Sequence, residues 1–150
     1  MDDKLIIGLT GQLAAGKTTV AKYLADKYQG KVYGFSGPLR DIADRLTLPQ
    51  TRENLANLSS ILRRQFGQDI ILRAIKRDVA TDPCRFIILE GMRRYGDFLA
   101  FKELPNFHLV AVVAEQRLRY ERMIKRNQNP DDASKTWEQF QLDEQGEAEQ

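Results

Sequence analysis

A short glycine-rich segment near the start of the chain constrains the fold more than any other feature. Residues 11–18 read Gly-Gln-Leu-Ala-Ala-Gly-Lys-Thr, with glycines five positions apart and Lys-Thr directly after the second glycine. This spacing is the pattern of a phosphate-binding loop, or P-loop. The glycines let the backbone turn tightly with its N–H groups pointing inward, so a phosphate lies among donors at the positive end of the next helix.

Each position of the P-loop predicts a contact with a nucleotide. Lys17 is expected to reach the β and γ phosphates, and the Thr18 hydroxyl is expected to hold Mg²⁺, so ATP and Mg²⁺ are the predicted cofactors. At average amino-acid usage the four fixed positions match by chance in roughly 0.5% of chains of this length. The alternative is a glycine-rich turn with a solvated lysine. The predicted cofactor-binding residues are Gly11, Ala14, Ala15, Gly16, Lys17, Thr18 and Thr19.

Short apolar runs alternate with helical patterns along the rest of the chain. The runs at 4–10, 31–35, 85–89 and 107–114 indicate strands. The last two are continuously apolar, as expected when helices cover both faces of a parallel sheet, so the fold class is α/β. The patterns between and after the strands predict these helices: 17–28, one from Pro38 that Pro49 stops, 52–66, 69–79, 95–104, 115–126, and a last one from about 134.

Composition and charge limit the class of protein. The chain has 150 residues, of which 42% are hydrophobic and 29% charged, typical of one globular domain. Its formal charge of +2 is too balanced to argue for a nucleic-acid or membrane partner. A single cysteine and the lack of a long apolar run favour a cytoplasmic location. A small-molecule partner is therefore expected, with the chain as a monomer or a homodimer.

Four segments resemble the P-loop nucleoside and nucleotide kinases, which include adenylate kinase, deoxynucleoside monophosphate kinases and dephospho-coenzyme A kinase. The segments are GLTGQLAAGKTTVAKYL, FSGPLRDIADRL, FIILEGMR and LRYERMIKRNQNPDDASKTWEQF, and the likeness extends from Lys4 to about Asp143. It implies one three-layer domain over 1–150, with parallel strands in the order 2-3-1-4 and a lid at about 125–136. These kinases continue into a fifth strand. Since no apolar run supplies it, we expect a chain that is truncated or completed by a partner.

The resemblance also implies which side chains meet the acceptor. Arg40, in the helix after the second strand, and Arg93, after the third strand, are expected to bind the acceptor phosphate. An aspartate that the relatives often carry before Pro38 is replaced by Gly37 here. Asp41 is the candidate substitute. Arg63 and Arg64 lie on a predicted helix that could cover the acceptor pocket, and Arg94 is expected at the surface.

The transferred phosphoryl group needs positive charge and a metal. Glu90 ends a predicted buried strand, the edge at which α/β sheets bind ligands, so it is the second expected Mg²⁺-site residue beside Thr18. Glu90 could instead cap the next helix. Arg122 and Arg126 match the lid arginines of the resembled kinases and are expected, with Lys17, to act on the phosphates. An ion pair with a neighbouring glutamate is the alternative for Arg122.

The predicted function is transfer of the γ-phosphoryl group of Mg-ATP to a nucleoside or deoxynucleoside monophosphate. Alternatives are a dephospho-coenzyme A kinase-like enzyme and an ATP-binding module without turnover. A GTPase is disfavoured because guanine recognition relies on Asn-Lys-x-Asp, which the sequence lacks.

Overall fold

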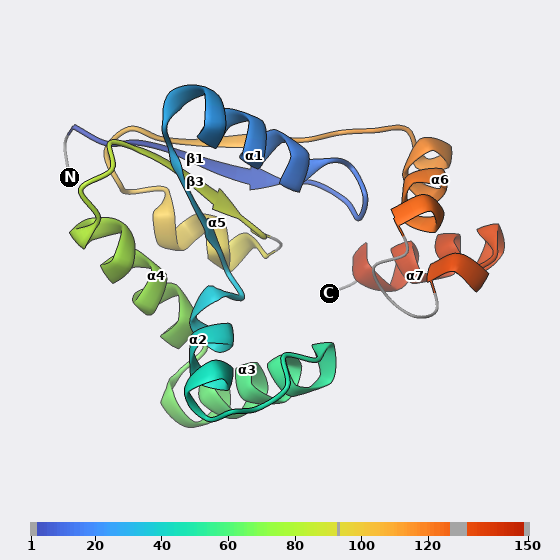
Figure 1. Ribbon diagram of the computed structural model, residues 1–150, viewed down its shortest axis with the longest axis horizontal. Coiled ribbons are helices and arrows are strands. Elements are labelled where there is room, and N and C mark those ends of the chain that lie inside the picture. The colour runs from blue at the N-terminus through green and yellow to red at the C-terminus, as the bar shows by residue number, and fades with distance from the viewer. Residues whose placement is uncertain (1–2, 93, 127–131, 149–150) are drawn as a thin grey trace.

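The computed structural model of the chain describes residues 3–92, 94–126 and 132–148 (Figure 1). Its centre is a four-stranded sheet in which every adjacent pair is parallel. The strand order is β2-β3-β1-β4, so the predicted α/β class and the order 2-3-1-4 are confirmed. The strands are β1 (Leu5–Thr10), β2 (Lys31–Gly34), β3 (Phe86–Glu90) and β4 (Phe107–Ala111).

Helices lie on both faces of this sheet (Figure 1). One face is covered by α1, and the other by α4 and α5, with α2 and α3 beyond them. The last two helices, α6 and α7, lie to one side, next to the loop that joins β1 to α1. The bounds are α1 (Lys17–Tyr28), α2 (Gly37–Arg45), α3 (Arg52–Phe66), α4 (Ile70–Thr81), α5 (Tyr95–Phe101), α6 (Gln116–Arg126), the short 3₁₀ helix η1 (Asp132–Ser134) and α7 (Trp137–Ala148).

Local sequence signals explain where the helices begin and end. The Thr51 hydroxyl accepts a hydrogen bond from the Asn54 backbone N–H, 3.1 Å away, which satisfies a donor in the first turn of α3. At the other end Gly67 has φ of 104°, a conformation that other residues rarely adopt. Pro38 lies in the first turn of α2, where its missing N–H costs nothing.

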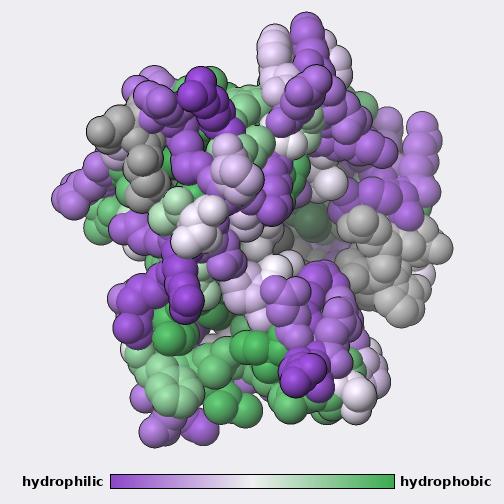
Figure 2. Space-filling model, turned by 60° about the vertical axis from the view of Figure 1, so that its left-hand side comes forward, coloured by the Kyte–Doolittle hydropathy of each residue, from purple (hydrophilic) through white to green (hydrophobic). Residues whose placement is uncertain are grey.

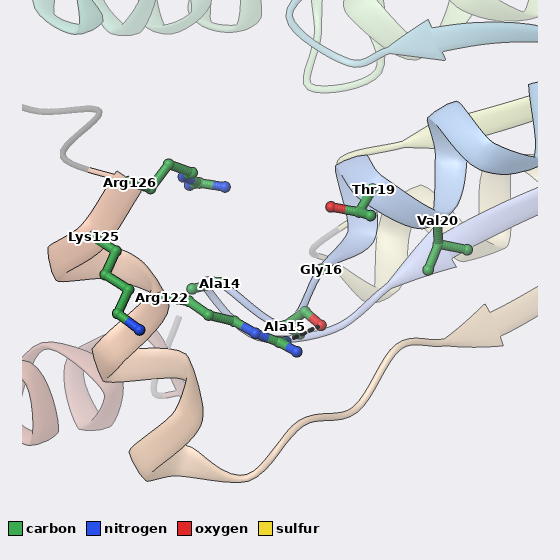
Figure 3. Close-up of a pocket in the computed structure, with 8 residues that line it drawn as sticks. All are labelled: Ala14, Ala15, Gly16, Thr19, Val20, Arg122, Lys125 and Arg126. Atoms are coloured by element: carbon green, nitrogen blue, oxygen red, sulfur yellow. Dashed lines mark hydrogen bonds between the residues drawn. The ribbon is translucent and has the colours of Figure 1, made fainter.

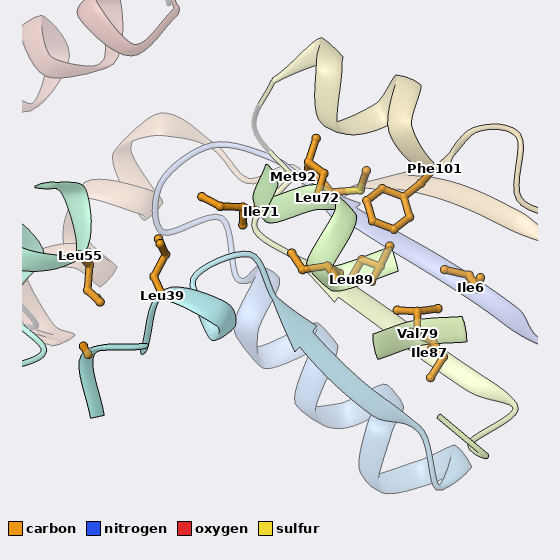
Figure 4. Close-up of a cluster of buried hydrophobic side chains, with 12 residues drawn as sticks. Ile6, Leu39, Leu55, Ile71, Leu72, Val79, Ile87, Leu89, Met92 and Phe101 are labelled. Atoms are coloured by element: carbon orange, nitrogen blue, oxygen red, sulfur yellow. The ribbon is translucent and has the colours of Figure 1, made fainter. Parts of the chain in front are cut away.

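Two apolar clusters make the three layers. Alternate residues of β3 point to opposite faces, so Ile87 and Leu89 belong to the larger cluster while Ile88 belongs to the smaller one. The larger cluster joins the sheet to α2, α4 and α5 (Figure 4), and the smaller one packs against α1. The middle of the sheet is therefore fully buried, while the ends of its strands carry the polar side chains.

The prediction for the fourth strand is wrong in its length and its burial. The strand β4 ends at Ala111, not at 114, and Leu109 and Val110 are 43% and 42% exposed. The reason is position: β4 lies at the edge of the sheet, and α6 turns away from it instead of covering it (Figure 1). Among the described residues no fifth strand pairs with β4.

The end of the described chain also differs from the prediction. The last helix begins at Trp137 rather than near 134, because Asp132–Ser134 form the 3₁₀ helix. Much of the polar segment at 127–134, and of the expected lid at 125–136, lies outside the described residues.

Some of the exposed apolar side chains lie around α2 and α3. Figure 2 shows them gathered at the lower end of the molecule, and the exposed ones there include Leu46, Leu48, Ile61 and Phe66. Within the described ranges, every helix is too short or too polar to cross a membrane.

Candidate nucleotide-binding site

The P-loop joins the carboxyl end of β1 to α1, the arrangement that phosphate binding requires. Two positions of this loop require glycine. Gly11 has φ of 140°, and a Cβ atom there would lie 2.2 Å from the carbonyl oxygen of Val112. Gly16, at φ of 106°, precedes the first turn of α1. Ala14 also takes a left-handed conformation, with φ of 57°, so the loop holds a strained turn that function can exploit.

The ammonium group of Lys17 lies against the main chain of its own loop. It donates hydrogen bonds to the carbonyl oxygens of Gly11, at 2.6 Å, and Gln12, at 2.8 Å. Backbone carbonyls carry only partial charge, so a phosphate oxygen would be a stronger partner for the same donors. The geometry places a cation at the loop, ready to exchange these bonds for bonds to a phosphate.

Thr18 and Glu90 meet beside the P-loop. The Thr18 hydroxyl donates a hydrogen bond to Oε1 of Glu90. The sheet explains this contact, because β1 and β3 are adjacent and Leu9 is in register with Glu90. Mg²⁺ is commonly bound by one or two protein oxygens together with substrate phosphates and water, and this hydroxyl–carboxylate pair fits that pattern. The structure thus brings together the two predicted Mg²⁺-site residues, and does not bear out the alternative reading of Glu90 as a helix cap: the described cap of α5 is Arg94, with Asp97 accepting from its N–H.

A cavity of about 540 Å³ lies between the P-loop and α6. Figure 3 shows Arg122 and Arg126 extending from α6 toward the loop and the start of α1. Arg122 donates to the carbonyl oxygen of Ala15 at 3.3 Å, so its described partner belongs to the P-loop. Lys125, which the sequence reasoning did not single out, also lines the cavity. The lining residues are Ala14, Ala15, Gly16, Thr19, Val20, Arg122, Lys125 and Arg126.

Arg119 is a second residue that sequence reasoning missed. Its side chain is only 3% exposed and forms an ion pair with Glu144 of α7. Its guanidinium also donates to the carbonyl oxygen of Leu13 in the P-loop, at 3.3 Å. Spacing could have revealed it, because positions 119, 122 and 126 share one face of a helix. The hydrogen bonds from Arg119 lower the pKa of the Glu144 carboxyl below its usual value.

Arg40 and Asp41, two of the residues predicted to bind the acceptor, are not among the described residues that line the cavity beside the P-loop. Arg40 is exposed on α2, where it donates to Gln50 at 2.8 Å and to the Ser36 hydroxyl at 3.3 Å. Its neighbour Asp41 is exposed as well. Arg93 lies outside the described residues.

A second cavity, of about 400 Å³, gathers other arginines. Its wall is one face of α3, where Ser59 and Ser60 lie one turn before Arg63 and Arg64, and Arg94 closes it from the start of α5. Arg63 is held in place by bonds to the Ser59 hydroxyl, at 3.2 Å, and to the Gln68 carbonyl, at 2.7 Å. Arg94 is exposed, as expected, and it also lines this cavity. The described lining residues are Ala56, Ser59, Ser60, Arg63, Arg64, Gln68 and Arg94.

Known families match most of the chain in sequence. A sequence profile described as an AAA domain matches residues 10–141. A UPF0200 protein of Hyperthermus butylicus is 31% identical over 91% of this chain and 72% of its own length. One from Methanocaldococcus jannaschii is 30% identical over 91% of this chain and 68% of its own length.

Solved structures share the fold. Shikimate kinase from Bacteroides thetaiotaomicron superimposes with a TM-score of 0.61 and 19% identity, over 94% of this chain and 76% of that one. TT1252 from Thermus thermophilus superimposes with a TM-score of 0.59 and 16% identity, over 97% of this chain and 83% of that one. The fold is thus that of P-loop kinases.

Proposed function

Because the chain belongs to the AAA domain family and to the UPF0200 family, we propose that it transfers the γ-phosphoryl group of Mg-ATP to a small nucleotide-like acceptor. The kinase-like fold supports phosphoryl transfer in general. The acceptor class, the metal and the roles of single residues are our proposals.

The observation that carries this proposal is the pair of walls around the 540 Å³ cavity. One wall is the P-loop, which suits a nucleotide phosphate, and the other is a row of cations on α6. Phosphoryl transfer needs little covalent help from a protein, so catalysis comes chiefly from holding substrates in line and neutralising developing charge. Arg122, Lys125 and Arg126 line the cavity opposite the loop, where they could neutralise charge on a transferred phosphoryl group.

The chain's own side chains supply most of that charge. In the proposed complex Lys17 binds the β and γ phosphates, and Arg122 and Arg126 contact the moving phosphoryl group from the opposite wall. Thr18 and Glu90 would hold Mg²⁺, which neutralises phosphate charge when it is bound. Approach of α6 to the P-loop would exclude water from the cavity, which strengthens each of these interactions.

The second cavity is the proposed place for the acceptor. Three arginines and two serine hydroxyls suit a phosphate group, and planar guanidinium groups bind phosphate through two parallel hydrogen bonds. Arg94 follows Glu90 by four residues, so their Cα atoms are at most about 14 Å apart. Arg94 therefore links this cavity to the carboxyl end of β3, at the same end of the sheet as the P-loop. The binding of the acceptor by Arg40, Asp41 and Arg93 stays a prediction.

Transfer of labelled phosphate tests the proposal directly. The chain is incubated with Mg-ATP labelled at the γ position and with each of a set of acceptors: ribonucleoside monophosphates, deoxynucleoside monophosphates and dephospho-coenzyme A. We expect one acceptor class to be labelled well above background. Lys17→Met should abolish the label, and Lys31→Met, at the opposite end of the sheet, is the matched control that should retain it.

Two other results would replace this proposal. If the wild-type chain binds ATP but no acceptor in the set is labelled, the chain is a nucleotide-binding module without turnover. If dephospho-coenzyme A alone is labelled, the dephospho-coenzyme A kinase-like alternative is right and the monophosphate acceptor is wrong.

A further inference from the structure

Arg119 is an ionised side chain almost fully removed from water, and its partners come from three separate segments. Its Nη2 atom donates to Oε2 of Glu144 at 3.1 Å, and Nη1 donates to Oε1 of the same carboxylate. Its Nε donates to the carbonyl oxygen of Ala114, 3.0 Å away, in the connection between β4 and α6. A buried charge is costly without such partners, so the loss of these hydrogen bonds should destabilise the packing around Arg119.

The same guanidinium reaches the P-loop. Nη1 also donates to the carbonyl oxygen of Leu13, 3.3 Å away. One turn later on α6, Arg122 donates to Ala15 at the same distance. Between these two carbonyls lies Ala14, in its left-handed conformation. Two arginines of one helix thus hold the carbonyls on either side of the strained residue of the loop.

The position of Glu144 is set by α7. Gln116, in the first turn of α6, donates to Oε2 of Glu144 at 2.8 Å, which fixes the carboxylate beside Arg119. Phe140, one turn earlier on α7, is 1% exposed, and its ring lies 5.7 Å from the Arg119 guanidinium carbon. Phe140 also packs with Tyr120 and Trp137. The ion pair is therefore available only while α7 is docked on α6.

We propose that Arg119 is a positioning residue that couples the docking of α7 to the conformation of the P-loop, and so to nucleotide affinity. When Glu144 is withdrawn, Arg119 must turn to find water or another partner, and it releases the Leu13 carbonyl. The loop then loses a restraint on the backbone N–H groups that surround a phosphate. This inference rests on the nucleotide-binding half of the proposed function and does not depend on an acceptor.

The coupling between α7 docking and nucleotide binding can also be detected from the other direction. If a docked α7 strengthens nucleotide binding by some factor, nucleotide binding must strengthen the docking of α7 by the same factor. Bound nucleotide should then slow amide hydrogen exchange in α7, although none of the described residues that line the nucleotide cavity belongs to this helix. A purely structural ion pair would stabilise α7 equally with and without nucleotide.

The test compares binding, stability and exchange in matched variants. Glu144→Gln keeps the shape and an accepting oxygen but removes the charge, and Arg119→Lys keeps the charge but removes the fork of donors. Glu138→Gln, on the exposed side of α7, is the control. The dissociation constant of Mg-ATP is measured by calorimetry well below each melting temperature, and exchange in α7 is followed with and without Mg-ATP.

We expect Glu144→Gln and Arg119→Lys each to weaken Mg-ATP binding about tenfold, and the two together to weaken it by less than the product, because each breaks the same contact. Glu138→Gln should bind as the wild type does. In the wild type, Mg-ATP should slow exchange in α7, and in Glu144→Gln it should not.

Unchanged Mg-ATP affinity in both folded variants would overturn the coupling, even if their melting temperatures fall. Exchange in wild-type α7 that ignores Mg-ATP would overturn it without any variant. A wild-type chain that binds no Mg-ATP would overturn this inference and the proposed function together. A chain that binds Mg-ATP and labels no acceptor would overturn the proposed transfer alone.

Discussion

Lysine side chains lie at both ends of the parallel strands, but their partners differ. At the amino end, Lys31 forms an ion pair with Asp82, 2.5 Å away, and Lys4 donates to the backbone carbonyls of Asp82 and Cys84. At the carboxyl end, Lys17 and Arg122 donate to carbonyls of the P-loop. A carboxylate is a strong and permanent partner, whereas a loop carbonyl can be exchanged for a phosphate oxygen.

Asp82 is the centre of the amino end. Its side chain is 5% exposed and accepts hydrogen bonds from Lys31, from the Tyr33 hydroxyl at 2.5 Å and from the Cys84 N–H at 2.7 Å. The Lys31 bond is the main reason that the pKa of Asp82 lies far below its usual value of 3.8. The same bond raises the pKa of Lys31 above 10.5. The charges at this end of the sheet pair with one another, whereas those at the other end are, in our proposal, used for a phosphate ligand.

Replacing one lysine at each end should separate the two roles most strongly. Lys17→Met should slow phosphoryl transfer by about 10² to 10³, the usual cost of removing one donor to a developing charge. Its melting temperature should change by no more than about 2 °C, as for most substitutions outside the core. Lys31→Met should do the reverse, with normal transfer and a lower melting temperature. Transfer assays and thermal melts on the same preparations check both.

The comparison fails if both variants lose transfer, since that would make the two ends one cooperative unit. It fails equally if Lys17→Met unfolds at a much lower temperature than Lys31→Met, because the P-loop lysine would then be a structural residue.

Replacing Arg126 tests how much the α6 wall of the cavity beside the P-loop contributes to phosphoryl transfer. Arg126→Ala should weaken transfer about ten- to a hundredfold, because a hydrogen bond to a charged group contributes about 1.5–3 kcal/mol. The effect should be smaller than that of Lys17→Met and should appear in kcat more than in KM for ATP. A rise in KM for ATP with kcat unchanged would mean that Arg126 contributes to binding the nucleotide and not to stabilising the transition state.

Sequence patterns predicted most of the fold because the fold follows periodicity and local signals. The strands, the P-loop and the bounds of α3 follow from apolar runs, fixed glycines and the cap at Thr51, whereas the strand order followed from the resemblance to P-loop kinases. The exposure of β4 was not predicted, since the same apolar run suits a covered strand or an exposed one. Its exposed residues became visible only when the neighbouring elements were placed.

The contacts of the candidate site could likewise be predicted only in part. Thr18 and Glu90 could be paired because adjacent parallel strands end together. The partners of Arg119 could not, because they depend on how the P-loop and α7 are placed around it. Arg119 has its counter-ion 25 positions further along the chain, and sequence spacing alone does not identify such a pair.

Acid should reveal the role of Asp82. Since its folded-state pKa is depressed, its contribution to stability is fully present above its unfolded pKa of about 3.8 and is lost as the pH falls below that value. Asp82→Asn should lower the melting temperature at pH 7 and flatten its decline below pH 4. Melts between pH 2 and pH 7 check this. A decline as steep in the variant as in the wild type would assign the acid sensitivity to other carboxylates.

An exposed ion pair at the same end of the sheet sharpens the comparison. Arg85 lies 3.6 Å from Asp3, and both side chains are at least four-fifths exposed. Water screens such a pair, so Arg85→Ala should reduce the free energy of unfolding by less than about 1 kcal/mol. Urea unfolding of this variant beside Asp82→Asn compares two carboxylate pairs that differ mainly in burial. If Arg85→Ala costs as much as Asp82→Asn, then position at the amino end, and not the buried hydrogen-bond network around Asp82, accounts for the stability of this edge.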